Sequence, residues 1–239
     1  MKKSIGIIGG MGPMATVDLF QKIISLTKAR SDYEHIHIYV DCNPSIPDRT
    51  AALLQSGESP VPMIRESAQK LIAMGADILL LPCNTSHAFY NEITEGLTVP
   101  LINMVEETAR IVQKKGVSKV GLLATDGTVR SGVYEKKLCC HQIDVIVPTL
   151  DDQKIVMDMI YKGVKAGNMQ PYIQPFCELI KKMKAFGIQT FILGCTELPL
   201  AVNSMKIDGI FIDPAVILAK AGIKMAGYCL NTDKEDVYE

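Results

Sequence analysis

One segment of the chain occurs twice, and this repeat constrains the fold more than any other feature. Residues 75–85 (GADILLLPCNT) align without gaps with residues 187–197 (GIQTFILGCTE), at an offset of 112 positions (195 − 83). Each copy is an apolar run that ends in a cysteine followed by small polar residues, a pattern typical of a buried strand leading into a helix. We therefore expect two related halves, with Cys83 and Cys195 in equivalent places.

Strand-like and helical patterns alternate through both halves, which predicts parallel sheets covered on both faces. Strands are expected at residues 5–8, 36–40, 77–81, 99–102, 119–124, 144–147, 190–193 and 210–212. Helices are expected at residues 14–30, 62–74, 85–95, 104–115, 131–140, 151–166, 171–186 and 214–227. The predicted fold is α/β, with two pseudo-symmetric domains, each a parallel sheet flanked by helices, and the active site in the cleft between them.

The last helix is expected to return to the first domain, because chain ends often lie close together. This gives a first domain of residues 1–102 plus 213–230, a second domain of residues 103–212, and a polar tail at 231–239.

Composition narrows the class of protein. The chain has 239 residues, 48% of them hydrophobic, and a net charge of −1, which favours a globular protein without a basic face for nucleic acid. No run approaches the roughly 18 to 20 apolar residues of a membrane helix, and the start is more typical of a first strand than of a signal peptide. The seven cysteines are odd in number and irregularly spaced, which indicates reduced thiols and a cytoplasmic location. Because no CxxC pair or Cys/His cluster is present, we expect no structural metal.

The paired cysteines predict a specific chemistry. A cysteine at a strand end and helix start lies in the field of backbone N–H groups, which lowers a thiol pKa from about 8.5 toward neutrality. Two such groups on opposite walls of a cleft suit removal of a proton from one face of a carbon and its return on the other face. That reaction is a racemisation or epimerisation, so Cys83 and Cys195 are the predicted catalytic pair.

A carbanion next to a carboxylate needs stabilising groups, and several candidates lie at the predicted strand ends. Arg49 is the best candidate for a second carboxylate, since a guanidinium binds one through two parallel bonds, and Lys165 is another candidate. Asp48 either pairs with Arg49 or orients Cys83, and Glu197 either caps its helix or tunes Cys195. The further candidates for substrate contact are Met11, Asn84, Thr85, Thr125, Thr128 and Thr196.

The chain resembles the aspartate racemases of the cofactor-independent Asp/Glu/hydantoin racemase superfamily. The resemblance rests on residues 7–13 (IIGGMGP), 45–49 (SIPDR), 82–87 (PCNTSH) and 194–198 (GCTEL), in this order, and extends to about residue 228. It implies a homodimer, no cofactor or metal, and a dicarboxylic amino acid as substrate. It also implies a two-base mechanism, with Cys83 acting on the D enantiomer and Cys195 on the L enantiomer, and carboxylate contacts from Arg49 and Lys165.

Other interpretations remain open. The same scaffold suits racemisation of glutamate, of hydantoins or of a broader range of amino acids, or another cofactor-free isomerisation. Residues 10–15 fit a relaxed dinucleotide fingerprint, which keeps open a nucleotide- or amino-acid-binding protein without turnover, although Pro13 removes a donor that a pyrophosphate needs. A redox role for the cysteines is a third alternative. His87 is expected in a supporting or surface position, and packing is expected of the remaining cysteines, Cys42, Cys139, Cys140, Cys177 and Cys229.

Overall fold

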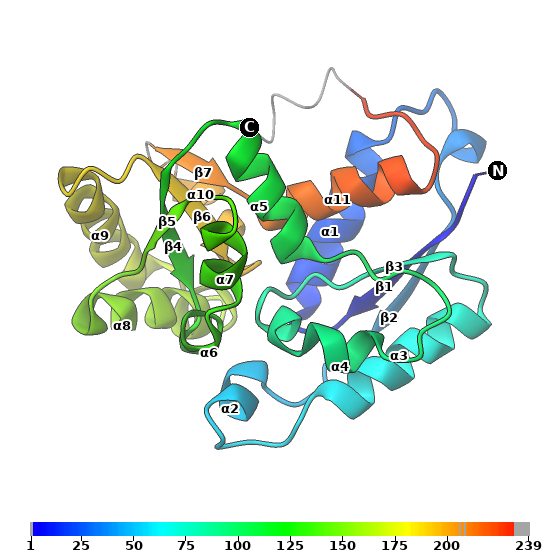
Figure 1. The fold of residues 1–239 in the computed structure, drawn as a ribbon, viewed down its shortest axis with the longest axis horizontal. Helices are drawn as coiled ribbons and strands as arrows, with labels where there is room; N and C mark the ends of the chain where they lie inside the picture. The colour runs from blue at the N-terminus through cyan, green and yellow to red at the C-terminus, as the bar shows by residue number, and fades with distance from the viewer. Residues whose placement is uncertain (1, 206, 208, 232–239) are drawn as a thin grey trace.

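The computed structural model describes residues 2–205, 207 and 209–231, in which strands and helices alternate through two halves (Figure 1). The first half contains β1 (Ile5–Gly9), α1 (Pro13–Leu26), a 3₁₀ turn (Asp32–Glu34), β2 (Ile38–Cys42), α2 (Arg49–Leu53), α3 (Val61–Ala73), β3 (Ile78–Leu80), a second 3₁₀ turn (Thr85–Phe89), α4 (Tyr90–Thr94) and α5 (Met104–Lys114).

The second half repeats this alternation and then returns to the first. Its elements are β4 (Lys119–Ala124), α6 (Asp126–Ser131), α7 (Val133–Cys139), β5 (Asp144–Ile146), α8 (Leu150–Asp158), a π-helical turn (Met159–Val164), a 3₁₀ turn (Gln170–Tyr172), α9 (Ile173–Ala185), β6 (Thr190–Gly194), α10 (Leu198–Met205), β7 (Ile210–Ile212) and α11 (Pro214–Met225).

Each half is built on its own parallel sheet. The first has the strand order β2-β1-β3 and the second has the order β5-β4-β6-β7. The strands β1, β3 and β6 are buried along their whole length, as expected for strands covered by helices on both faces. The predicted α/β fold with two sheets flanked by helices is therefore confirmed. Because all strands of a sheet point the same way, the loops after them gather at one edge.

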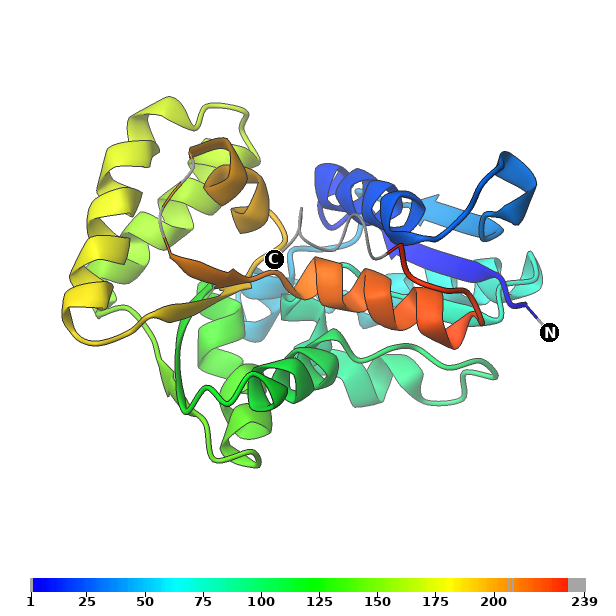
Figure 2. The same ribbon diagram turned by 90° about the horizontal axis from the view of Figure 1, so that it is seen from above.

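Two helices connect the halves. The helix α5 packs onto the second sheet, where Val105, Ala109 and Val112 share an apolar cluster with Val120 and Leu122. The last helix, α11, lies between α1 and α5 (Figure 2) and also contacts β3. A Cβ atom at Gly222 of α11 would lie 2.9 Å from Leu80 Cδ1, so the glycine permits this close approach to the first sheet.

These contacts of α11 support the domain division expected from the sequence, which we keep as a proposal: residues 1–102 with 213–230, and residues 103–212. Of the proposed tail at 231–239, only Asn231 lies within the described residues.

Several element boundaries differ from the predictions. The predicted strand at 99–102 is a single bridge between Leu79 and Leu101. The predicted helix at 131–140 corresponds to α7 (Val133–Cys139). The short helix α6 (Asp126–Ser131) was not predicted; it ends before α7 because Gly132 adopts φ 64°, a left-handed conformation. The short helices α2 and α10 were not predicted, since their apolar residues showed no clear period. The helix α1 ends at Leu26 instead of residue 30.

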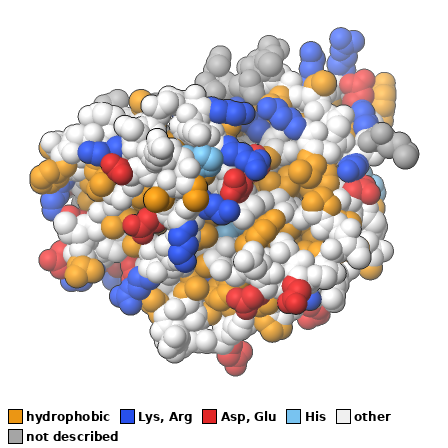
Figure 3. Space-filling view, viewed as in Figure 1, with side chains coloured by type: hydrophobic (Ala, Val, Ile, Leu, Met, Phe, Trp, Pro, Cys, Tyr) orange, Lys and Arg blue, Asp and Glu red, His pale blue; other side chains and the backbone are white. Residues whose placement is uncertain are grey.

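Charged side chains of both signs are interspersed on the face in Figure 3. On α5, Arg110 pairs with Glu106 and Glu107, and Lys137 of α7 also pairs with Glu106. Within the described part of the chain, no helix is long and apolar enough to cross a membrane.

Candidate active site

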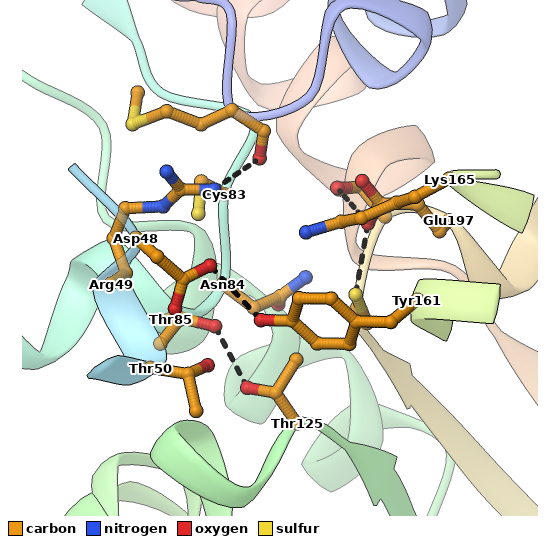
Figure 4. A pocket seen from close by; sticks show the side chains of 13 residues that line it. Asp48, Arg49, Thr50, Cys83, Asn84, Thr85, Thr125, Tyr161, Lys165 and Glu197 are labelled. Atoms are coloured by element: carbon orange, nitrogen blue, oxygen red, sulfur yellow. Dashed lines mark hydrogen bonds between the residues drawn. The ribbon is translucent and has the colours of Figure 1, made fainter. Parts of the chain in front are cut away.

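A narrow pocket lies where the loops after the strands of both sheets meet (Figure 4). All the candidate site residues predicted from the sequence line it except Thr128, whose hydroxyl lies behind Thr85. Thr50 and Tyr161 also line it and were not predicted. The full lining is Met11, Asp48, Arg49, Thr50, Cys83, Asn84, Thr85, Thr125, Tyr161, Lys165, Cys195, Thr196 and Glu197.

Cys83 follows β3, and hydrogen bonds of its backbone N–H and C=O groups fix its position. Its side chain is 5% exposed, and its N–H donates to Leu81 O at 2.8 Å. His87 lies one turn further on and is fully buried, with Nε2 accepting from Met104 N–H at 3.1 Å. Nδ1 therefore carries the proton and donates to Cys83 O at 2.9 Å. Burial lowers the pKa of His87, so this supporting role belongs to the neutral imidazole.

Arg49 places a positive charge beside Cys83, on the side of the pocket formed by the first half of the chain. It opens α2 directly after Asp48, whose carboxylate caps that helix by accepting from Ala51 N–H at 2.8 Å. The guanidinium is 8% exposed and donates to the carbonyls of Ile46 and Pro47 and, across the pocket mouth, of Met11. Burial opposes its charge, but Cys83 and Asp48 outweigh that effect and place the pKa of Arg49 above its ordinary value.

Cys195 lies in an opposite electrostatic setting. Its thiol donates to Glu197 Oε2 at 2.9 Å, and both side chains are buried. Burial raises the pKa of the Cys195 thiol well above its ordinary value, the charge of Glu197 raises it further, and Lys165 opposes only part of this. The expectation that the helix N-terminus lowers this pKa is wrong for Cys195, because burial and, after it, the charge of Glu197 outweigh the backbone N–H field.

Lys165 and Tyr161 close the pocket from the second half. Lys165 lies at the exposed rim, with Nζ 4.3 Å from the centre of the Tyr161 ring. The surrounding protein disfavours its charge, but Glu197 and Cys195 outweigh this and raise the pKa of Lys165. The Tyr161 hydroxyl donates to Asp48 Oδ2 at 3.1 Å, which joins the two halves across the pocket (Figure 4).

Polar side chains at the pocket floor also join the two halves. The hydroxyl of Thr85 lies 3.0 Å from that of Thr125 and 2.9 Å from that of Thr128. The Tyr134 hydroxyl donates to Asn84 Oδ1 at 2.6 Å, which leaves the Asn84 Nδ2 group free of a partner among the described residues. The Thr196 hydroxyl donates to Pro82 O at 3.3 Å. Asn84 is thus fixed with its donor group unused.

The glycine turn after β1 is explained by packing inside the protein. A Cβ atom at Gly10 would lie 2.2 Å from the backbone of Asn43, and one at Gly9 would lie 2.4 Å from Thr16 Cγ2. The Gly10 N–H donates to Thr16 Oγ1 at 2.9 Å. These glycines therefore admit neighbouring protein atoms. In a dinucleotide fingerprint the second glycine, here Gly12, lets the backbone approach a pyrophosphate, but a Cβ atom at Gly12 would lie 3.3 Å from Glu197 Oε1.

The pocket is almost filled by its own side chains. It leaves about 10 Å³ for the centre of a water-sized sphere, which is room for roughly one water molecule. A wider groove adjoins it, lined by Pro13, Met14 and Val164 and sharing Arg49, Lys165 and Glu197 with it. A ligand larger than a water molecule therefore needs the side chains or the two halves to move apart before it reaches the cysteines.

The other cysteines do not pack as predicted. Cys42, Cys139, Cys140 and Cys229 are exposed and Cys177 is half-buried, so the expectation of core packing is wrong for them. Buried thiols among the described residues occur only at Cys83 and Cys195. No group of three or more His, Cys, Asp or Glu side chains in the described ranges is placed to hold a metal ion.

Tyr161 is the main pocket residue that the sequence did not reveal. It lies in the π-helical turn Met159–Val164, a feature often found at functional sites, and no motif marks it. Thr50 was overlooked because it ends a loop that was expected to lack a helix. It packs against α6, where a Cβ atom at Gly127 would lie 2.8 Å from Thr50 Cα.

Comparisons with known proteins agree on one family. The family model described as Asp/Glu/Hydantoin racemase matches residues 8–222. The solved structure of an aspartate racemase from Picrophilus torridus is 35% identical with a TM-score of 0.88, covering 97% of each chain. The broad specificity amino-acid racemase RacX of Bacillus subtilis is 28% identical over 92% of this chain and 96% of its own. A glutamate racemase from Francisella tularensis, solved with D-glutamate, shares the fold at 22% identity, with a TM-score of 0.68 and coverage of 94% and 80%.

Proposed function

We propose that this chain, which belongs to the Asp/Glu/hydantoin racemase family and is therefore an isomerase of the racemase type, interconverts L- and D-aspartate. In this proposal Cys83 and Cys195 are the two acid–base groups. The observation that carries it is the convergence of the two buried thiols, one from each half of the chain, on a single pocket with two cationic side chains.

The charges of the pocket match a dicarboxylic substrate. Arg49 and Lys165 both keep their positive charge, since the pKa of each is raised. Each carboxylate of aspartate then finds a cation, and the free Asn84 Nδ2 group adds a donor. Thr85 and Thr196 lie beside Asn84 in the same lining and are proposed to support the α-carboxylate as negative charge develops on it.

The proposed proton transfers balance at every step. Cys83, as thiolate, takes the α-proton of D-aspartate, and the C–H electron pair remains on the α-carbon and its carboxylate. The Cys195 thiol then gives its proton to the opposite face, which yields L-aspartate. The raised pKa of Cys195 fits its role as the initial acid, and the reverse reaction exchanges the two roles.

The decisive experiment is exchange of the α-proton in deuterated water, followed by proton NMR without any added cofactor. We expect exchange from both L- and D-aspartate, together with formation of the opposite enantiomer on chiral chromatography. Absence of exchange with aspartate, glutamate and a panel of other amino acids would overturn the proposed function.

A second candidate is racemisation of glutamate or of a broader set of amino acids. The similarity to RacX over nearly the whole of both chains favours it. The same chiral assay on a panel of amino acids separates the two candidates, because a higher kcat/KM for a neutral amino acid than for aspartate would favour the broad activity. Tight binding of an amino acid with no turnover would instead support a binding protein.

We further propose a homodimer that uses the outer face of α1. Met14, Val17, Phe20 and Ile24 follow helical spacing on this face and are 62%, 54%, 37% and 40% exposed. An apolar stripe of this kind is often an interaction site. We expect sedimentation to give a dimer for the natural chain and a monomer for Val17→Glu. Phe186→Glu, at an exposed position in the second half, serves as the control that keeps the dimer.

A reducing, cytoplasmic location is the last part of the proposal. Its support is that all seven cysteines are unpaired, four of them exposed.

A further inference from the structure

Three buried polar atoms of the pocket have no hydrogen-bond partner among the described residues: Arg49 Nε, Asn84 Nδ2 and Glu197 Oε1. Two of these atoms belong to donors and one is an acceptor. Leaving a buried polar group unpaired costs about 1–3 kcal/mol, and more for a charged group. Such atoms gathered in one pocket indicate groups that a ligand completes.

The acceptor is one oxygen of a carboxylate whose other oxygen is already used. Glu197 is 3% exposed, and its Oε2 accepts from the Cys195 thiol at 2.9 Å. Its Oε1 faces Gly12 of the opposite half, where an added Cβ atom would lie 3.3 Å away. Since glycine carries no side chain, residue 12 offers no side-chain partner to this buried oxygen.

Asp48, the other carboxylate of the pocket, is not available in the same way. Its Oδ1 accepts from Ala51 N–H at 2.8 Å and its Oδ2 accepts from the Tyr161 hydroxyl at 3.1 Å. Of the two acids that line the pocket, only Glu197 therefore presents an unused anionic acceptor. Arg49 and Lys165 repel a cationic group, so a cation entering this pocket is directed to Glu197.

We infer that Glu197 Oε1 receives the α-ammonium group of the amino acid, which makes Glu197 the residue that selects amines over plain dicarboxylates. This inference rests on the proposed function for the identity of the ligand. The geometry is consistent with it, because the ammonium nitrogen is one bond from the α-carbon. An ammonium on Oε1 therefore brings the α-carbon beside the thiol that is held on Oε2.

Occupation of Oε1 by an ammonium group also changes the acidity of Cys195. The negative charge of Glu197 helps to keep the pKa of Cys195 high. An ammonium bound to Oε1 neutralises much of that charge, so substrate binding lowers the pKa of the thiol beside it. Cys195 then becomes easier to deprotonate only when an amine occupies the pocket.

The experiment compares two ligands that differ in the amine. Racemic DL-aspartate and succinate are titrated into the full-length protein by calorimetry, the racemate being used so that turnover produces no net reaction. We expect the natural protein to bind aspartate at least tenfold more tightly than succinate, which corresponds to one charge-assisted hydrogen bond. Glu197→Gln should remove most of this preference by weakening the binding of aspartate, while succinate binds at least as tightly as before because one negative charge has left the pocket.

Asp48→Asn is the matched control, since it removes one negative charge from the same pocket without touching the unused acceptor. We expect it to keep the preference for aspartate over succinate, whatever its effect on activity. Equal weakening of both ligands by Glu197→Gln, or an unchanged preference, would overturn the inference. So would a natural protein that binds neither ligand.

The result is separable from that of the proposed function. If the natural protein exchanges the α-proton but Glu197→Gln keeps the preference for aspartate over succinate, only the ammonium site is refuted. If the natural protein binds aspartate selectively but exchanges no proton, only the racemase activity is refuted.

Discussion

The two walls of the pocket look alike in sequence and differ in charge. Cys83 and Cys195 both follow a buried strand, but Cys83 lies beside the Arg49 guanidinium whereas Cys195 donates to the Glu197 carboxylate. Cys83 is also anchored through its carbonyl to His87, and Cys195 has no such imidazole at the equivalent position, which is occupied by Pro199. Equivalent positions in a duplicated fold thus carry two different acid–base settings.

The difference bears on which group starts as the acid in the proposed reaction. Burial and, after it, the charge of Glu197 raise the pKa of Cys195, which keeps this thiol protonated. In the proposed reaction the pocket therefore starts with a proton donor on the Cys195 wall and with the role of base left to Cys83. Substitutions on either side of the pocket test this asymmetry.

Loss of either sulfur should abolish racemisation. We expect Cys83→Ser and Cys195→Ser each to lower kcat by about 10²- to 10⁴-fold, because a serine hydroxyl is a poor acid–base group at neutral pH. If Cys83 deprotonates D-aspartate and Cys195 deprotonates L-aspartate, as proposed, each variant loses α-proton exchange mainly with one enantiomer. Cys83→Ser loses exchange with D-aspartate, and Cys195→Ser loses it with L-aspartate. Cys42→Ser, at an exposed thiol, should retain activity. Full activity in either pocket variant would refute the two-base scheme.

Substitution of Arg49 should have the next largest effect, on the binding of aspartate. Replacement by Lys keeps one charge but loses the planar donors that hold three backbone carbonyls, so the cation no longer has a fixed direction. We expect Arg49→Lys to weaken binding of DL-aspartate by about 10- to 100-fold, measured by calorimetry. Arg30→Lys at an exposed position is the control. Unchanged affinity would remove Arg49 from the proposed carboxylate site.

The thiol titration tests the Cys195 wall directly. Because Glu197 helps to raise the pKa of Cys195, Glu197→Gln should move the alkylation of Cys195 by iodoacetamide to lower pH. The measurement uses Cys83→Ser backgrounds, with mass spectrometry of the peptide that contains residue 195. Asp48→Asn should leave the profile in place. A shift to higher pH in Glu197→Gln would contradict the assigned cause.

His87, which supports the Cys83 backbone, should make a smaller, pH-dependent contribution to the free energy of unfolding. Burial lowers the pKa of His87, so the unfolded chain binds a proton near pH 6.5 while the folded protein keeps a neutral imidazole. This contribution is fully present above about pH 6.5 and is lost as the pH falls, by up to about 1.4 kcal/mol per pH unit. Urea unfolding between pH 5 and 7 measures it.

We expect His87→Gln to reduce the slope of the unfolding free energy against pH. His37→Gln, at an exposed imidazole, should leave the slope as it is. An unchanged slope in His87→Gln would show that this imidazole titrates in the same way in the folded and unfolded chain.

Much of the site followed from local sequence. The gap-free repeat located both cysteines, and the polar residues beside them line the same pocket because short strand-to-helix connections fix their neighbours. Thr128 lies just behind this lining, in contact with Thr85 and Thr125, which the sequence pattern does not show. Tyr161 could not be found, because a tyrosine within a helix shows no sign of the Asp48 carboxylate that it meets 113 residues away in the chain.

The sequence by itself determined the α/β fold, the two related halves and the family, because these depend on hydrophobic period and on short motifs that act locally. Only the tertiary structure decided the charge next to each sulfur. These charges act through space: Arg49 reaches Cys83 from a separate loop, and buried Glu197 folds back onto Cys195. The repeat predicted two equal thiolates, whereas packing produced one thiol beside a cation and one held on a carboxylate.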